Sequence, residues 1–420
     1  MRRSNKLWFM TPLALASALH AGNVVADWTA IGSTTIVANG GKASPSSFVW
    51  FAYSSLAMYD AVNAITGEYE PFYYRMSGPS SASIDAAAAA AAHRILVNYF
   101  PAQQAALDTQ YNASLAALTA SPDAKTAGVA VGEAAAMAVI SARTGDGLEA
   151  SVTYTPGSGP GAWIPTPPAY AAPAVPWLGQ MRPFTMKSPS DQLPDPPRAF
   201  SSEPWSRDYN LTRNYGGTNS TDRSARETEI GIFWTEHTGQ QFARTFNDLV
   251  TNNNLGTADA ARMMAMLWTG VADSLIGCFN AKYKYGFWRP ITAIEAGGQR
   301  PDTLPDPAWV PLATTPNHPE YPAAHGCATG AASTLIADFF GTTKVHIVTD
   351  SLAFADGVHQ HVFEDTRDLM DEVFWARIYA GFHFYHSLEA GRQLGETVAQ
   401  GLARNHFRAM NGHRGNAGNQ

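Results

Sequence analysis

Three short segments in the second half of the chain carry the residues best suited to chemistry. The first runs from Ala281 to Pro290 and contains Lys282 and Arg289, seven residues apart among four aromatic residues. On one helix, seven residues are close to two turns, so both cations point the same way and Pro290 ends or kinks the helix behind them. Cations packed among aromatic rings need a partner, whereas surface lysines and arginines are simply solvated. The segment therefore favours an anion site.

The second segment runs from His318 to Cys327 and contains two prolines, two alanines and two histidines. Pro322 suits the first turn of a helix, which leaves the backbone N–H groups of Ala323, Ala324 and His325 free at its positive end. These groups form a second candidate anion site, with His325 at its mouth. A single histidine near a helix start is more often structural than catalytic, so His325 gains weight only from its neighbours.

The third segment contains Arg377 and His383, again among aromatic residues. Six residues do not lie on one face of a straight helix, so the two side chains converge only if the chain bends, and Gly381 is the natural place. A buried structural histidine is the alternative interpretation. His386, one helical turn further on, competes with His383 as the active histidine.

Helical patterns must position these segments. Ser44 is the predicted N-cap of the first long helix and Pro45 its first residue. Gly128 and Gly132 allow a neighbouring helix to approach closely. Apolar periodicity returns from about residue 225 and continues, with breaks, to 407, without a segment that predicts a sheet. Helices are predicted over residues 46–64, 85–100, 102–118 and 124–144.

The fold class expected from these patterns is all-α, a helical bundle with one long Pro/Gly-rich wrapping segment. Residues 151–221 are rich in Pro, Gly, Ser and aromatic residues and are expected to be non-helical. Trp163 and Trp177 indicate an ordered excursion over the helices, and a flexible linker is the alternative. The predicted parts are an N-terminal helical part (27–150), this excursion (151–221), a C-terminal helical part with the oxyanion site (222–410) and a flexible tail (411–420).

The first 26 residues resemble a signal peptide, with a basic start, a short apolar stretch and a candidate cleavage site before Asp27. The stretch is too short to span a bilayer, although an uncleaved amphipathic anchor is the alternative. We therefore expect an exported protein, periplasmic or secreted, without a transmembrane domain. With 28 Lys and Arg against 35 Asp and Glu, the charge balance argues against nucleic acid as a partner.

Together the three segments resemble the superfamily that joins vanadium-dependent haloperoxidases to type-2 phosphatidic acid phosphatases. Its signature is a Lys, six residues, then Arg-Pro; a Pro-Ser-Gly-His; and an Arg with a His six positions later. The corresponding runs here are Lys282 to Pro290, Pro322 to His325, and Arg377 to His383. The runs 57–65, 161–168 and 287–294 are similar to bacterial secreted members of the haloperoxidase branch.

The resemblance implies a helical bundle with one pocket for vanadate, which phosphate can also occupy. Lys282, Arg289, Arg377 and the Ala324 N–H would hold its oxygens. His383 would bind the vanadium and His325 would act as the acid–base residue. Lys282 would in addition polarise the bound peroxide. The implied substrates are hydrogen peroxide and halide, with a small organic molecule as a further candidate.

Two other functions remain open. A phosphatase would use His383 as the nucleophile and His325 to protonate the leaving group. The phosphatases carry an acid four residues after that nucleophile, and Ser387 stands there instead, which favours the peroxidase. His318, seven residues before His325, is the halide-site candidate and favours bromide over chloride. Ala323 replaces the signature serine and removes a hydroxyl donor, so a non-catalytic anion-binding relative is the third hypothesis.

Two smaller patterns concern cysteine and histidine. Cys278 and Cys327 flank the first two segments and are close enough for a disulfide if those segments share one pocket. Two buried free thiols are the alternative. His359 and His361 have a spacing that zinc sites use, but such pairs arise often and no further zinc motif supports them.

Overall fold

The structure is a computed structural model that describes residues 22–410. Its regular secondary structure there is helical apart from one hairpin, which confirms the predicted all-α class. The predicted tail and most of the predicted signal peptide lie outside the described residues. The first half contains α1 (Val24–Ser33), α2 (Ser44–Thr66), α3 (Ile84–Tyr99), α4 (Gln104–Ala117) and α5 (Pro122–Arg143). The second half contains α6 (Glu203–Gly216), α7 (Ala225–Phe233), α8 (Thr238–Asn252), α9 (Thr257–Tyr285), α10 (Pro290–Ala296), α11 (Ala324–Phe340), α12 (Thr366–Tyr379) and α13 (Tyr385–Asn405).

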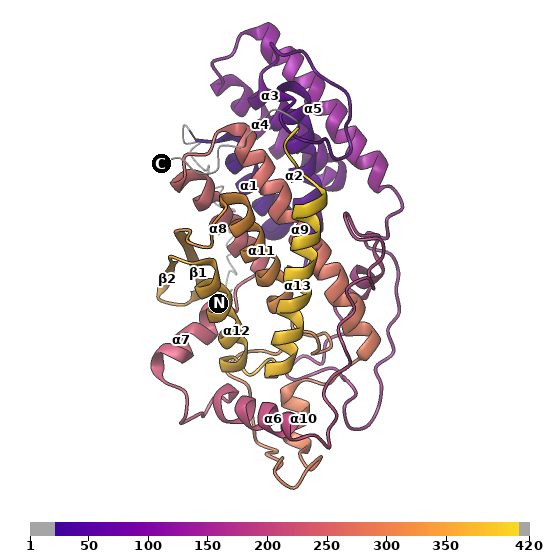
Figure 1. Cartoon of the computed structure of the whole chain (residues 1–420), viewed down its shortest axis with the longest axis vertical. Coiled ribbons are helices and arrows are strands. Elements are labelled where there is room, and N and C mark those ends of the chain that lie inside the picture. The colour runs from indigo at the N-terminus through magenta and orange to yellow at the C-terminus, as the bar shows by residue number, and fades with distance from the viewer. Residues whose placement is uncertain (1–21, 411–420) are drawn as a thin grey trace, which may run out of the picture.

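The core lies where the long helices α2 and α9 pack against each other, with α11 and α13 beside α9. Trp268 of α9 stacks on Phe51 of α2, with 4.1 Å between ring centroids. Figure 1 shows α3, α4 and α5 at one end of the elongated molecule and α6 with α10 at the other. The long helices between them connect the two halves through one apolar core.

Helix α2 begins one residue before the predicted position, since Ala43 is its N-cap and Ser44 its first residue. The Ser44 hydroxyl instead accepts a hydrogen bond of 3.1 Å from the Thr238 backbone N–H, at the start of α8. Helix α1 begins at Val24, and Val24, Val25 and Ala26 are buried. A cut before Asp27 would therefore fall inside α1.

Helix α5 packs closely on α3 through the two glycines that the sequence singled out. A Cβ added to Gly128 or Gly132 would lie 2.3 Å from the backbone oxygen of Ser83 or Ala87 respectively. Only glycine allows this approach. Within residues 22–410, α5 is also the one helix with the length and apolar composition to cross a bilayer, and 33% of that stretch is buried. Core helices of soluble proteins pass the same test.

The segment 151–221 wraps over the helices, and its first fifty residues descend along one side of the molecule in Figure 1. Trp163 is fully buried, and Ala162 pairs with Phe287 in an isolated β-bridge beside the first chemical segment. The expectation that this segment contains no helix was wrong, because α6 lies within it. The Ser202 hydroxyl caps α6 and Pro204 occupies its first turn, so the same residue types that favour loops here begin a helix.

A two-stranded antiparallel hairpin interrupts the second half, although no sheet was predicted. Its strands are β1 (Ile347–Phe354) and β2 (Gly357–Phe363), and Ile347 pairs with Phe363. Buried and half-exposed residues alternate along the first half of β1, which is the pattern of a strand with one face on a core. The hairpin packs against α7, α8 and α12.

Helices α11 and α13 approach each other so closely that backbone meets backbone. A Cβ on Gly391 or Gly395 of α13 would lie 2.4 Å or 2.2 Å from the backbone oxygen of Ala323 or Cys327. Gly326 and Gly330 of α11 make the reciprocal approach to α13. This packing fixes the N-terminal ends of both helices side by side, and each end carries one of the candidate histidines.

Candidate active site

The second and third chemical segments meet at a cavity of about 710 Å³. Residues of both halves of the chain line it, from the start of α2 to the turn before α13. Among the residues named from the sequence, the lining contains His318, Ala324, His325, Arg377 and His383.

Lys282 and Arg289 lie in the layer behind this lining. The Lys282 ammonium donates to the carbonyl oxygens of Pro319 (2.8 Å) and Glu320 (2.9 Å). Arg289 donates from Nε to the His318 carbonyl at 2.8 Å and from Nη1 to the Phe382 carbonyl at 3.0 Å. Both cations thus hold the backbone of segments whose histidines face the cavity.

The expectation that Lys282 and Arg289 share one helix was wrong. Helix α9 ends at Tyr285, because the next residue, Gly286, adopts a left-handed conformation with φ of 54°. Arg289 is the N-cap of α10 and Pro290 its first residue, so the proline starts a helix rather than ending one. The two cations reach the same region from two different helices.

Arg377 and His383 converge through a bend, and the bend contains Gly381 as the spacing predicts. Helix α12 ends at Tyr379, Gly381 has φ of 77°, and α13 begins at Tyr385. The Arg377 guanidinium donates from Nη1 to the Trp234 carbonyl at 2.6 Å. Its Nε is buried and has no hydrogen-bond partner within residues 22–410.

The three buried cations create an excess of positive charge. Burial lowers the pKa of Lys282 to about 8, of Arg289 to about 10 and of Arg377 to about 9, and the charge of Arg289 contributes to the lowering at Lys282 and Arg377. Glu320 is a buried carboxylate beside these cations, whereas Glu236, which also lines the cavity, pairs with Arg244 at 2.7 Å. An anion bound at the cavity would compensate the remaining charge and offer a partner to Arg377 Nε, so the residues present fit an oxyanion such as vanadate.

Glu320 is the functional residue that sequence reasoning missed. It is fully buried, and its Oε1 lies 2.8 Å from His383 Nδ1 and accepts the Phe384 N–H at 3.0 Å. Its Oε2 accepts the Ser387 hydroxyl at 2.6 Å. Burial raises the pKa of Glu320 to about 7 against these donors. An acidic residue inside an otherwise apolar and aromatic run was the available signal.

The position of Glu320 bears on the choice between a peroxidase and a phosphatase. Ser387 stands where the phosphatases carry an acid, and its absence there favoured the peroxidase. The structure supplies the acid from Glu320 and uses Ser387 to hold it. His383 therefore has a carboxylate on Nδ1 in either interpretation.

His325 lies at the start of α11 and is partly exposed to the cavity. Its Nε2 is 3.2 Å from the Thr238 hydroxyl. Burial within the protein, together with Arg377, Lys282 and Arg289, holds the pKa of His325 well below its ordinary value. The imidazole is accordingly neutral near pH 7 and can accept a proton.

The helix start differs slightly from the prediction. Helix α11 begins at Ala324, with Ala323 as its N-cap, two residues after Pro322. The Ala323 N–H is not free, because it donates to the Ser387 carbonyl at 2.9 Å. Ala324 and His325 are the first two helical residues, so their N–H groups lie at the positive end of α11.

His318 lines the cavity with its ring tied to the cation behind it. Its Nδ1 is 3.0 Å from Arg289 Nη2 and 3.2 Å from the Pro319 carbonyl oxygen. The tautomer that accepts from Arg289 carries its proton on Nε2, whereas the one that donates to Pro319 carries it on Nδ1. Burial, followed by the charges of Lys282 and Arg289, holds the pKa of His318 well below its usual value. In the first tautomer, His318 offers an N–H donor to a small anion in the cavity.

His386, the competing histidine, belongs to a different cavity. It lies with Asp195, Arg198, Tyr321 and Glu389 around a polar hollow of about 570 Å³. Its backbone N–H donates to Asp208 at 3.2 Å. None of the residues that line the first cavity lines this one. His383 is therefore the histidine that lies with His325.

The two cysteines are free and buried, which agrees with the alternative of two buried free thiols rather than a disulfide. Cys278 lies on α9 one turn before Lys282, and Cys327 lies on α11 two residues after His325. Their side chains are in hydrogen-bond contact, and the Cys278 thiol also donates to the Pro322 carbonyl at 3.7 Å. The structure thus places two thiols, rather than a disulfide, behind the cavity.

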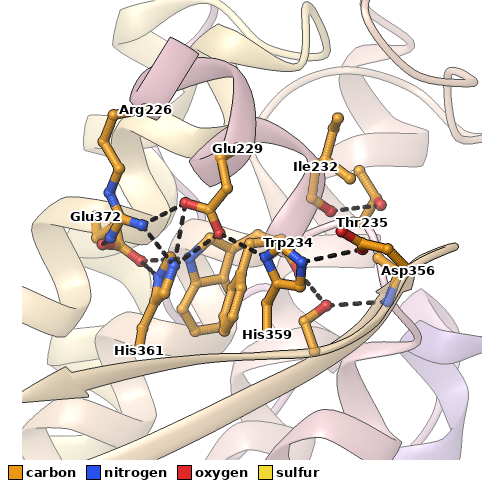
Figure 2. Close-up of polar contacts among 12 residues, drawn as sticks. Arg226, Glu229, Ile232, Trp234, Thr235, Asp356, His359, His361 and Glu372 are labelled. Carbon is orange, nitrogen blue, oxygen red and sulfur yellow. Dashed lines mark hydrogen bonds and ion pairs between the residues drawn. The ribbon is translucent and has the colours of Figure 1, made fainter.

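The His359 and His361 pair lies on β2 outside the cavity, and Figure 2 shows its partners. His361 lies between Glu229 and Glu372, whereas His359 contacts Asp356 at 3.1 Å. Within the described part of the chain, no group of three or more His, Cys, Asp or Glu side chains is arranged to hold a metal ion. The pair belongs to an ion-pair cluster.

Comparisons with known proteins agree with this geometry. Residues 262–412 match a family model described as the VCPO second helical-bundle domain. Vanadium chloroperoxidase from Curvularia inaequalis is 26% identical over 182 residues, which cover 35% of this chain and 29% of that protein. The match thus spans less than a third of the length of that relative.

Two solved structures resemble the whole fold. One is described as the first bacterial vanadium-dependent iodoperoxidase: 22% identity, a TM-score of 0.78, and coverage of 92% of this chain and 96% of that one. The other is an apo-type bacterial vanadium-dependent chloroperoxidase: 17% identity, a TM-score of 0.68, and coverage of 85% and 92%. The resemblance drawn from the three motifs is confirmed.

Proposed function

We propose that this protein, whose residues 262–412 match the vanadium haloperoxidase family, is itself a vanadate-dependent haloperoxidase. It would oxidise halide with hydrogen peroxide to hypohalous acid. The observation that carries the proposal is a group of three buried cations beside the buried carboxylate of Glu320. In addition, Arg377 Nε has no hydrogen-bond partner within residues 22–410. That charge excess requires a multiply charged anion.

The proposed cofactor is vanadate, held by Lys282, Arg289, Arg377 and the Ala324 N–H. When bound, vanadate supplies a Lewis acid that activates hydrogen peroxide toward halide without changing its own oxidation state. His383 would be the ligand to vanadium. Glu320 accepts the Nδ1 proton of His383, so the ring is held as the tautomer whose Nε2 carries a lone pair.

His325 is the proposed acid–base residue. A neutral imidazole with a low pKa is ready to take a proton from hydrogen peroxide as the substrate binds, and the Thr238 hydroxyl orients it. The charges of Lys282, Arg289 and Arg377 oppose a second positive charge on this ring. The same charges would therefore drive His325 to pass the proton on quickly, to the product or to water.

Bromide is the proposed halide. The support is His318, whose Nε2–H can donate to an anion in the cavity, at the position where the chloroperoxidases of the family tend to have Phe. The names of the two solved relatives include iodide and chloride, so all three halides need comparison. The cavity also has apolar walls from Phe48, Leu275 and Phe382 and room for a small organic acceptor.

The direct test is bromination of monochlorodimedone by the purified apoprotein with hydrogen peroxide and bromide, with and without added orthovanadate. Turnover that depends on vanadate supports the proposal, and parallel assays with iodide and chloride measure the preference. Bromination that proceeds equally without vanadate, after treatment with a chelator, contradicts the proposed cofactor.

An exported phosphatase with a phosphohistidine intermediate is the second candidate. The observation in its favour is the Glu320 carboxylate on His383 Nδ1, since a carboxylate on the far nitrogen also orients a nucleophilic histidine. Hydrolysis of p-nitrophenyl phosphate that vanadate inhibits, without bromination, would move the protein to this class. No activity in either assay, together with measurable phosphate binding, would identify the protein as the non-catalytic anion-binding relative that Ala323 suggests.

We also propose that the chain is exported to the periplasm or secreted. The basic and apolar residues at its start support export. Because Val24 to Ala26 are buried in α1, cleavage before Asp27 would remove core residues, and we propose that the signal is cut before Val24. N-terminal sequencing of the exported protein tests this boundary; a chain beginning at Asp27 contradicts it.

A further inference from the structure

Trp234 reaches the candidate site through its backbone carbonyl. This oxygen accepts the Arg377 Nη1 hydrogen at 2.6 Å. The Arg377 Nε is buried and has no hydrogen-bond partner within residues 22–410, so the Trp234 carbonyl is a contact that orients this guanidinium.

The side chain of Trp234 is fixed by the same helix that carries Arg377. Its indole Nε1 donates to Glu372 Oε1 at 3.0 Å, and Glu372 lies five residues before Arg377 on α12. Trp234 is fully buried and directly follows α7. The residue is thus tied to α12 at two points, one through its ring and one through its carbonyl.

Glu372 is in turn held by a group of charged residues outside the cavity, which we call the outer cluster: Arg226, Glu229, His361 and Glu372. His361 Nδ1 lies 2.6 Å from Glu372 Oε1, and His361 Nε2 lies 3.0 Å from Glu229 Oε1. Arg226 pairs with Glu229 and lies 3.6 Å from Glu372 Oε2. Figure 2 shows these side chains converging around His361, with Trp234 beside them.

The outer cluster joins three elements that the chain brings together only in the fold. Arg226 and Glu229 come from α7, His361 from β2 and Glu372 from α12. The His361 ring also stacks on Phe233, the residue before Trp234, with 3.8 Å between centroids and 5° between planes. The hairpin therefore holds both the start of the Trp234 segment and its anchor on α12.

We propose that Glu372 and His361 are positioning residues for the site: through Trp234 they fix the orientation of the Arg377 guanidinium. This inference rests on the proposed function, because it assigns the two residues a role toward the oxyanion. None of the four cluster residues lines the cavity, so none of them is placed to contact an anion bound there.

The physical argument is the same as for residues that hold metal ligands from behind. A hydrogen-bonded partner outside the site typically changes affinity or activity by about 10- to 100-fold when it is removed, because the ligand loses its orientation. Here the Arg377 guanidinium is held by the Trp234 carbonyl. Release of the Trp234 ring lets that carbonyl shift, and the guanidinium loses its fixed orientation.

The test compares Glu372→Gln and His361→Gln with His346→Gln as the matched control. His346 directly precedes β1 of the same hairpin, and its ring pairs with Glu364 at 2.8 Å rather than with a residue of the outer cluster. Isothermal titration calorimetry measures the dissociation constants of orthovanadate and inorganic phosphate with the apoprotein. Steady-state kinetics give kcat and the KM for halide.

The expected result is that both test variants bind vanadate and phosphate about tenfold more weakly. Their kcat falls while the KM for halide changes less than twofold, because His318, the proposed halide residue, is not hydrogen-bonded to Trp234. His346→Gln matches the wild type in every readout. Equal effects of His346→Gln and His361→Gln would overturn the proposal, since the hairpin would then act only through its stability. Wild-type values for both test variants would overturn it as well.

A second variant covers a loss of folding. If Glu372→Gln loses its circular dichroism signal, Trp234→Phe removes the indole N–H but keeps the carbonyl and most of the ring volume. It should reproduce the weaker anion binding, and wild-type affinities there contradict the proposal. If the wild type binds an anion but halogenates nothing, the proposed function fails while the binding measurements still decide this inference. If the wild type binds neither anion, this inference is overturned as well.

Discussion

The Glu320 carboxylate lies 2.8 Å from His383 Nδ1, although 63 residues separate the two in the chain. Both residues are almost completely buried, so water does not screen their interaction. The carboxylate also accepts the Phe384 N–H and the Ser387 hydroxyl, which fixes it in the plane of its donors. The result is a histidine with a single tautomer and a single orientation toward the cavity.

Replacement of Glu320 by Gln should weaken vanadate binding by about 10- to 100-fold. The amide keeps the size of the side chain but presents only one acceptor oxygen, so His383 loses its charged partner or Ser387 loses its acceptor. Calorimetric titration of the apoprotein with orthovanadate measures the change. Ser387→Ala is the matched control, because it removes one donor to the carboxylate and leaves the His383 contact; its effect should be the smaller one. Equal affinities of wild type and Glu320→Gln would refute a role for the pair in holding the oxyanion.

Restoration of the signature serine, Ala323→Ser, should strengthen oxyanion binding by about tenfold. A hydroxyl at this buried N-cap adds a donor at the positive end of α11, and one hydrogen bond to a charged group contributes about 1 to 3 kcal/mol. Comparison of the dissociation constants of vanadate and phosphate in the variant and the wild type tests this. A weaker affinity in Ala323→Ser would show that another group already takes the place of the hydroxyl.

Removal of the His325 ring, in His325→Ala, should lower turnover by about 10²- to 10⁴-fold while vanadate still binds. The neutral imidazole adds no charge to the anion site, so its removal should leave vanadate binding in place. Under either catalytic hypothesis the role of His325 is to move a proton. Halogenation rates and circular dichroism of the variant and the wild type give the comparison. Unchanged activity in a folded His325→Ala variant would assign the acid–base role elsewhere.

Gly381→Ala should destabilise the protein by more than about 1 kcal/mol and weaken anion binding at the same time. The residue has φ of 77°, which strains any side chain, and a Cβ there would lie 2.5 Å from the Gly216 carbonyl oxygen. Because the bend brings Arg377 and His383 together, its distortion moves both. Urea unfolding measures the loss of stability, and vanadate titration measures the loss of binding. Gly357→Ala is the control: this residue has a positive φ of 132° in the hairpin turn but open space around it, so its variant shows the effect of backbone strain without crowding.

Asp60 should make the stability of the fold depend on pH below neutrality. Burial raises the pKa of this carboxyl from 3.8 to about 6, despite three backbone N–H donors from Phe72, Tyr73 and Tyr74. A carboxyl whose pKa is higher in the folded state stabilises the fold in its protonated form. The free energy of unfolding of the wild type relative to Asp60→Asn should therefore fall as pH rises from about 4 to about 6, by at most about 3 kcal/mol. A pH-independent difference between the two proteins contradicts the raised pKa.

Apolar periodicity predicted α2, α3, α4 and α5 of the first half but not α1, whose first residues fall in the predicted signal peptide. The close approach at Gly128 and Gly132 and the bend at Gly381 were also predictable, since glycine at those places has few other uses. The segment from 151 to 221 was harder, because Ser202 and Pro204 begin α6 with residues that also occur in loops.

Sequence motifs predicted only part of the candidate site. Arg377, His383 and His325 were named from their spacing, whereas Glu320 was not, because its partner lies 63 residues away and only the fold brings them together. The same limit explains Lys282 and Arg289. Their spacing suggested one helix, and a single left-handed glycine between them divides it into two.

The cavity wall is assembled from distant parts of the chain. The candidate anion ligands and acid–base residues all come from residues 282–383, while Ser44 and Phe48 of α2, Ala174 of the wrapping segment, and Glu236 and His237 before α8 line other parts of the wall. Mutation at these other positions can therefore reshape the space for an acceptor molecule without replacing a candidate anion ligand. Under the proposed function, selection has two separate targets: one group of residues sets how fast the oxidant forms, and the other sets which molecule meets it first.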